Sequence, residues 1–133
     1  MGTGSPFPLI ELDGKKMRVS QVNNSFIFPG LALGILVSHA LRVTDGMIMA
    51  AAKALASLSP SRTDSSAPLL PAIGESRKVA MTVSEAVARQ ALADGVAGIE
   101  GEAGIAGRIR EYVWNPVYVP YERIELSRAT DTA

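Results

Sequence analysis

The sequence contains no cysteine and only one histidine among its 133 residues. Without cysteine, the chain can form neither disulfides nor metal sites with thiolate ligands. The single histidine and the absence of a dense carboxylate cluster argue further against a metal site built by this chain alone. Aromatic residues are also scarce, at 5%, so the core is expected to consist mainly of Ala, Val, Leu, Ile and Met.

The chain also lacks an excess of charge of either sign, because 13 basic residues balance 13 acidic ones. This balance removes the electrostatic footprint of a protein that binds nucleic acid or an anionic membrane, and we expect neither partner. The longest apolar stretch, residues 26–37, is interrupted by Pro29-Gly30 and falls short of the roughly 20 residues that span a bilayer. The first six residues do not resemble a signal peptide, which predicts a cytoplasmic protein.

The length allows one modest domain with a real core. Asp13-Gly14 predicts a tight type I′ turn, with a small hairpin formed by short flanks at residues 9–10 and 17–19. Hydrophobic spacing and helix-stop signals predict helices over residues 31–41, 46–58, 75–94 and 105–114. The first is apolar on nearly every side, which is typical of a buried helix. Thr44 or Asp45 is the expected N-cap of the second, and Gly95 the residue after the third.

Three segments carry no helical pattern. Residues 57–71 are rich in Ser and Pro, which predicts a surface loop. Residues 117–121 are expected to be extended and to lie against the body, with Trp114 and Tyr118 anchoring them. The last residues, 127–133, are expected to be a disordered tail.

Two adjacent amides, Asn23 and Asn24, are the strongest candidates for a binding site. A primary amide can bind a carboxylate or a carboxamide without bringing a charge of its own. Pro29 is suited to the first turn of a helix, whose free N–H groups and positive dipole end would face a nearby anion. The segment suits recognition of a small acid, but it contains no nucleophile, general base or metal ligand. The alternative is that both residues only shape a turn, since Asn bonds readily to its own backbone.

Other polar residues are better explained by structure than by chemistry. His39 follows Ser38 directly, so on a helix the two side chains diverge and cannot act as a nucleophile–base pair. Gly34 and Ser38 are four residues apart, which favours close packing of another backbone against this helix. Lys53 and Lys78 fall on helical patterns and are expected to be solvated.

Several sequence blocks together resemble one enzyme family, the malic enzymes, in the C-terminal portion of their NAD(P)-binding domain. The resemblance covers most of the chain, residues 1–126, and depends on the order and spacing of the blocks. The blocks are Thr3–Phe7, Gln21–Gly30, Arg42–Asp45, Ala50–Leu55, Leu70–Pro71 and Trp114–Tyr118. Two positions depart from the family's pattern, Ser20 where a Gly is usual and Gly46 where an acidic residue is frequent.

The resemblance implies that the complete enzyme decarboxylates malate oxidatively to pyruvate and carbon dioxide, using NAD or NADP and Mg²⁺ or Mn²⁺. It implies that Asn23 and Asn24 contact malate or the nicotinamide end of the cofactor, while Gly4 and Ser5 help to shape the cofactor cleft. The family's catalytic Tyr and Lys, metal ligands and Gly-rich fingerprint have no counterpart in this sequence. No catalytic or metal-binding residue is therefore assigned here.

The expected fold is mainly α with a small β-hairpin, as a C-terminal fragment of a Rossmann-like α/β NAD(P)-binding domain. We expect the isolated chain to be inactive and its partners to be malate, NAD(P) and the remainder of a malic enzyme. The alternative is a helical interaction module without catalytic activity, which self-associates into a homo-oligomer through uncovered apolar surface.

Overall fold

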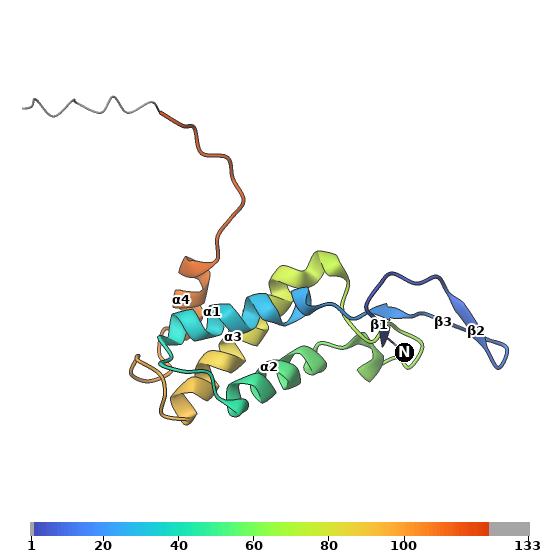
Figure 1. The fold of residues 1–133 in the computed structure, drawn as a ribbon, viewed down its shortest axis with the longest axis horizontal. Helices are drawn as coiled ribbons and strands as arrows, with labels where there is room; N and C mark the ends of the chain where they lie inside the picture. The colour runs from blue at the N-terminus through green and yellow to red at the C-terminus, as the bar shows by residue number, and fades with distance from the viewer. Residues whose placement is uncertain (1, 123–133) are drawn as a thin grey trace, which may run out of the picture.

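A computed structural model describes residues 2–122 of the chain. The described part is mostly helical, with two very small sheets (Figure 1). Its α-helices are α1 (Phe28–Ser38), α2 (Asp45–Ser57), α3 (Ser76–Ala93) and α4 (Ile105–Tyr112). Single turns of 3₁₀ helix occur at η1 (Asn24–Phe26), η2 (Pro60–Arg62) and η3 (Ile73–Glu75).

One of the sheets is the predicted hairpin. Strands β2 (Ile10–Leu12) and β3 (Lys15–Met17) are antiparallel and extend away from the helices (Figure 1). Asp13 and Gly14 between them have φ values of 51° and 72°, and positive φ at both central residues is what a type I′ turn requires. The predicted turn is therefore confirmed.

The other sheet joins the start of the chain to the residues that follow the hairpin. Strand β1 (Gly2–Thr3) runs parallel to β4 (Ser20–Gln21), with Gly2 opposite Ser20 and Thr3 opposite Gln21. The Val22 N–H extends this ladder by donating to the Thr3 carbonyl at 2.7 Å. The hairpin thus forms part of a crossover between two parallel strands.

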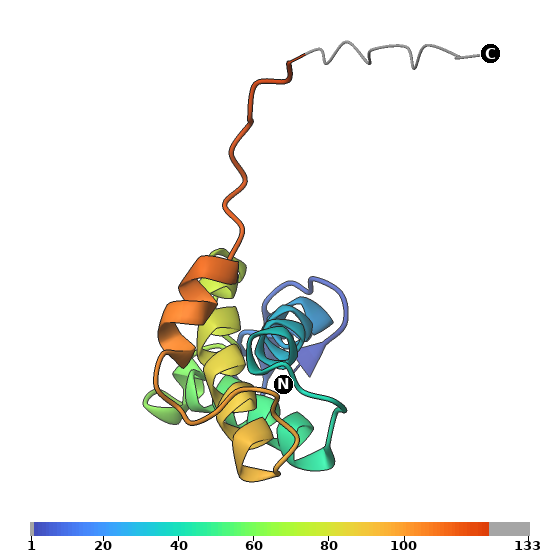
Figure 2. The same cartoon turned by 90° about the vertical axis from the view of Figure 1, so that its left-hand side faces the viewer.

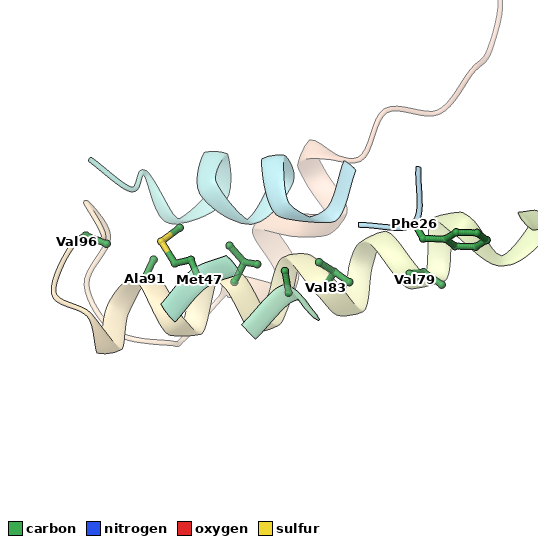
Figure 3. Close-up of a cluster of buried hydrophobic side chains, with 8 residues drawn as sticks. Phe26, Met47, Val79, Val83, Ala91 and Val96 are labelled. Atoms are coloured by element: carbon green, nitrogen blue, oxygen red, sulfur yellow. The ribbon is translucent and has the colours of Figure 1, made fainter. Parts of the chain in front are cut away.

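The core forms along α3, with α1 packed on one side and α2 on another (Figures 1 and 2). Figure 3 shows the buried side chains in a row along α3, from Phe26 beside Val79 at one end to Met47 and Val96 at the other. The predicted four-residue spacing on α3 is confirmed, because Val79, Val83, Val87 and Ala91 are all buried. A second cluster, Val37, Ala88, Ile105 and Ile109, fixes α4 against α1 and α3.

Small residues on α1 allow it to lie very close to α3. A Cβ atom added at Gly30 would lie 2.6 Å from the Val83 Cβ, and one added at Gly34 would lie 2.6 Å from the Val87 Cβ. Ser38 continues the same row and is fully buried, with its hydroxyl donating to the Ile35 carbonyl at 3.1 Å. The expectation that these small residues serve helix packing is confirmed.

The start of α2 is capped as predicted. The Thr44 Oγ1 accepts a hydrogen bond from the Met47 N–H at 3.1 Å, which satisfies one of the donors left free at a helix N-terminus. The same hydroxyl donates to the Asp94 carboxylate, which also accepts a bond from the Gln90 amide. The cap therefore ties the start of α2 to the end of α3, and Gly95 follows in the left-handed region with φ of 66°.

Three expectations about boundaries and burial were wrong in part. Helix α1 ends at Ser38 rather than at residue 41, because His39 adopts a left-handed C-cap with φ of 52°. It is not buried on every side either, since Phe28 and Leu36 are 65% and 57% exposed; the helices that pack on α1 cover only part of its circumference. Helix α4 stops at Tyr112, two residues before Trp114.

The segment 57–71 is only partly a surface loop. Residues 62–66 are exposed, but Pro71 is buried and Leu70 packs against the main core cluster. The apolar Leu-Pro end of this segment thus belongs to the body, which the high Ser and Pro content of the whole segment had obscured.

Val113 packs against the second core cluster, but residues 114–122 are exposed and do not lie against the body, contrary to the prediction. Trp114 is 76% exposed and Tyr118 is fully exposed, so neither anchors the segment. Figures 1 and 2 show the chain leaving the helices after α4 as an extended segment without regular secondary structure. The helix has already ended at Tyr112, and Pro116 favours extended backbone at Asn115. The side chain that does connect this segment to the body is Asn115, whose carbonyl oxygen accepts a hydrogen bond from Arg77 on α3. The predicted disordered tail, 127–133, lies outside the described residues.

Candidate functional site

The parallel pair of strands brings the predicted site residues to one edge. Gly4 and Ser5 follow β1 directly, and Asn23 and Asn24 follow β4 after one intervening residue. Because the carboxyl ends of parallel strands meet at the same edge, both blocks leave the sheet on the same side. All four residues are exposed there. The carboxyl edge of parallel strands is also the usual ligand-binding position in open α/β sheets.

Asn23 has a structural role that the turn alternative anticipated. Its extended backbone makes it the N-cap of η1, and its Oδ1 accepts a hydrogen bond from the Ser25 N–H at 3.0 Å. The Nδ2 group makes no hydrogen bond within residues 2–122 and is therefore available as a donor. The cap fixes the direction of this amide before any ligand arrives.

Asn24 lies one residue further along and differs from Asn23. Its backbone carbonyl accepts a bond from the Ile27 N–H at 3.0 Å, but its exposed side chain makes no hydrogen bond in the part of the chain that the structure describes. Phe26, at the end of η1, is 4% exposed and packs into the core. One buried aromatic ring thus anchors a turn whose two amides face solvent.

Helix α1 begins immediately after this turn, as expected from Pro29. Its N-cap, Ile27, makes no side-chain capping bond, and no acidic residue lies in its first turn. The positive end of the helix dipole is therefore not neutralised by its own side chains. Together with the two amides, this end can attract a small anion.

A cavity of about 510 Å³ lies beside these blocks. Phe7, Gln21 and Phe26 from the sequence blocks that resemble the malic enzymes line it, together with Arg18 and Glu75 and residues of the segment 68–73. Asn23 and Asn24 do not belong to its lining, so the cavity adjoins the amide pair and does not contain it. Sequence reasoning missed Arg18 and Glu75 as cavity residues, since neither lies in a recognisable motif.

The other polar residues occupy the positions that structure explains. His39 is an exposed C-cap and Ser38 is buried in helix packing. Lys53 and Lys78 are exposed on α2 and α3 as expected. Within residues 2–122, no group of three His, Asp or Glu side chains is placed to hold a metal ion. No described helix is both long enough and apolar enough to cross a membrane.

Comparison with known proteins identifies the family. The family described as the NAD-binding domain of malic enzyme matches residues 1–92. The chain is 42% identical to the NAD-dependent malic enzyme of Pseudomonas aeruginosa strain PAO1 over 123 residues, which is 92% of this chain and 22% of that protein. It is 42% identical to the enzyme of the same name from Acinetobacter baylyi, over 93% of this chain and 22% of the relative. It is 38% identical to the NAD-dependent malic enzyme of Proteus mirabilis, over 92% of this chain and 22% of that protein.

The matched region corresponds to the NAD-binding domain of the malic enzyme class. The chain belongs to the malic enzyme family, and the resemblance noted in its sequence blocks is confirmed. It spans about a fifth of the length of the curated relatives that it matches.

Proposed function

We propose that this chain supplies the malate- and nicotinamide-facing part of an NAD-dependent malic enzyme. The reaction is the oxidation of malate by NAD with loss of carbon dioxide, which yields pyruvate. The observation that carries the proposal is the common edge where Gly4-Ser5 and Asn23-Asn24 leave parallel strands β1 and β4. The names of the relatives support NAD as the cofactor.

In this proposal the amides are neutral donors to the substrate. Nδ2 of Asn23, whose oxygen is already held by the Ser25 N–H, and the uncommitted side chain of Asn24 donate to a malate carboxylate or to the nicotinamide carboxamide. Gly4 and Ser5 line the approach of the cofactor. The positive end of α1 adds to the attraction of the anionic substrate.

These contacts are too weak to bind malate alone. A neutral hydrogen bond contributes roughly 0.5–1.5 kcal/mol, whereas even millimolar affinity corresponds to about 4 kcal/mol beyond association costs. We therefore propose that the isolated chain is inactive, and that the catalytic acid and base, the divalent cation and its ligands come from the remainder of a malic enzyme. When bound, the cation would polarise the substrate's oxygen atoms. The family relationship favours this proposal over a self-associating module without catalytic function.

The test uses two proteins, the chain alone and a chimera. In the chimera, this chain replaces the matching segment of the Pseudomonas aeruginosa enzyme. With malate, NAD and Mn²⁺, the chimera is expected to reduce NAD and the chain alone is not. Turnover by the purified 133-residue chain would show that its own residues carry the catalysis. A chimera that folds but stays inactive would count against this chain as the functional equivalent of that segment.

Two substitutions at one position separate ligand binding from turn formation. Asn23→Ser keeps an oxygen that can cap η1 but removes the amide donors, whereas Asn23→Ala removes both. If the donors contact malate, both variants of the chimera raise the KM for malate by a similar factor, about 3–10-fold for one lost hydrogen bond. If Asn23 only caps the turn, the Ser variant behaves like the parent chimera and the assignment of Asn23 to the substrate is wrong.

A further inference from the structure

A second cavity, of about 470 Å³, lies along strand β3 of the β2–β3 hairpin. Three cationic residues line it, Lys15, Lys16 and Arg18, and no carboxylate does. The wall opposite the hairpin comes from the segment 61–69 and includes Ser65. This cavity shares Arg18 with the cavity beside the amide pair, but none of Gly4, Ser5, Asn23 and Asn24 lines it. It is therefore distinct from the proposed malate site.

The hairpin concentrates positive charge at this cavity. Three of the four residues from 15 to 18 are basic, and in the hairpin register Lys15 faces Leu12 while Lys16 faces Glu11. None of the three is within ion-pair distance of a carboxylate in the described part of the chain, where both ion pairs involve Arg89. Glu11 offsets part of the charge of Lys16 across the hairpin, and the remaining positive charge at this cavity attracts anions locally.

The opposite wall is held in place by hydrogen bonds. The Leu69 N–H donates to the Ser20 hydroxyl at 2.6 Å, and the Ser59 hydroxyl donates to the Leu69 carbonyl at 2.6 Å. Asp64 accepts bonds from both the N–H and the hydroxyl of Ser66, at 2.9 and 2.6 Å. The segment is thus tied to β4, the strand that follows the hairpin. This bond fixes the position of one wall of the cavity relative to the other.

These bonds also show which hydroxyl is free. The Ser66 proton is committed to Asp64, and the bonds from Ser66 hold the pKa of that carboxyl below its ordinary value. The Ser59 hydroxyl donates its proton to the Leu69 carbonyl. The Ser61 hydroxyl, 2.8 Å from that of Ser59, must therefore donate to Ser59. Ser65 makes no side-chain hydrogen bond among residues 2–122. It is therefore the hydroxyl in this wall that can donate to a ligand.

We propose that this cavity binds a small phosphorylated molecule through its phosphoryl group. The phosphoryl group would lie at the edge of β3, where the long side chains of Lys15, Lys16 and Arg18 approach it from the two faces of the strand, and the Ser65 hydroxyl would approach it from the opposite wall. Three cations suit a dianion better than a single carboxylate, and ammonium groups are effective point charges for phosphate. The volume falls in the range of about 300–1,000 Å³ that small-molecule sites occupy.

The experiment measures amide shifts of the ¹⁵N-labelled chain during titration with inorganic phosphate, pyrophosphate and, in a separate arm, malate. The expected result is saturable shifts at residues 15–18 and 61–69, larger for pyrophosphate than for phosphate and small for malate. Inorganic phosphate tests the phosphoryl group itself, and tighter binding of pyrophosphate would indicate a ligand that carries more than one such group.

Two double variants with the same change in charge provide the control. The Lys15→Gln/Lys16→Gln variant is expected to weaken phosphate binding about ten-fold or more, while Lys53→Gln/Lys78→Gln changes it less than about two-fold. Ser65→Ala is expected to weaken binding about two- to five-fold without altering the charge. Its small change in volume on an exposed loop keeps the test valid if the double variant disturbs the hairpin.

Three results would overturn the proposal. Equal losses of affinity in both double variants would show general attraction to lysines, and shifts spread over all basic residues would show the same. Malate binding as strongly as phosphate in this cavity would exclude phosphoryl selectivity. None of these results bears on the amide pair, so this site and the proposed malate site can fail independently.

Discussion

Replacement of Gly34 by alanine should destabilise the protein, although alanine is the better helix former. An added Cβ at this position lies 2.6 Å from the Val87 Cβ and 2.8 Å from the Ser84 carbonyl oxygen. Ordinary contacts of a Cβ begin at 3.4 Å, so α1 and α3 would have to separate by several tenths of an ångström. The second contact is to backbone, which cannot rotate out of the way.

The magnitude follows from two opposing terms. Overpacking in a close-packed interior typically costs about 1–3 kcal/mol, and a gap of 0.5–1 Å opened elsewhere along the helix pair forfeits about a quarter to a half of each dispersion contact. The alanine returns roughly 0.8–1 kcal/mol of helix propensity. We expect a net loss of about 1–2 kcal/mol in the free energy of unfolding for Gly34→Ala.

Gly107 provides a matched control within the same chain. It lies inside α4, has no atom within 4 Å of an added Cβ and is not among the glycines with positive φ. Gly107→Ala should therefore gain about 0.5–1 kcal/mol from propensity alone. Urea denaturation followed by helical circular dichroism measures both variants. If Gly34→Ala were as stabilising as Gly107→Ala, the close approach of α1 to α3 would be wrong.

Three further predictions concern the cap of α2 and the segment after α4. Thr44→Ala should lower the free energy of unfolding by about 0.5–2 kcal/mol, and Thr44→Ser should restore most of it, because only the hydroxyl caps the helix; denaturation midpoints of the three proteins decide this. The hydrogen bond from Thr44, followed by that from Gln90, lowers the pKa of Asp94 from 3.8. This carboxylate therefore stabilises the fold above about pH 4, and that contribution disappears as the pH falls through the lowered pKa. Thermal melts of Asp94→Asn between pH 2 and 7 should lack this part of the acid destabilisation, and an unchanged pH profile would contradict the assignment. Trp114→Ala and Tyr118→Ala should each change stability by less than about 0.5 kcal/mol, since both side chains are exposed and exposed positions tolerate substitution; a larger loss in either melt would mean that the segment packs on the body.

Local chemistry predicted most of the secondary structure. The type I′ turn at Asp13-Gly14 and the cap at Thr44 each depend on a few neighbouring residues, so the sequence alone was sufficient to identify them. The four-residue spacing of valines on α3 likewise predicted its buried face. The family blocks marked Asn23 and Asn24 as candidates, although the amide pair by itself is equally typical of a turn.

Which side chains are buried, and which segments lie side by side, depends on contacts between residues far apart in the chain. No local sequence pattern predicts such contacts. An all-round apolar α1 was expected to be buried, yet Phe28 and Leu36 are exposed because its neighbours cover only part of it. Trp114 is a large aromatic residue of the kind that anchors a segment, but its side chain is exposed and does not pack against the described body. The sequence by itself determined where the chain turns, where α2, α3 and α4 begin and to which family the chain belongs. Only the tertiary structure decided that β1 and β4 lie side by side and that α1 and α3 meet at their glycines, because both depend on close approach of segments far apart in the chain.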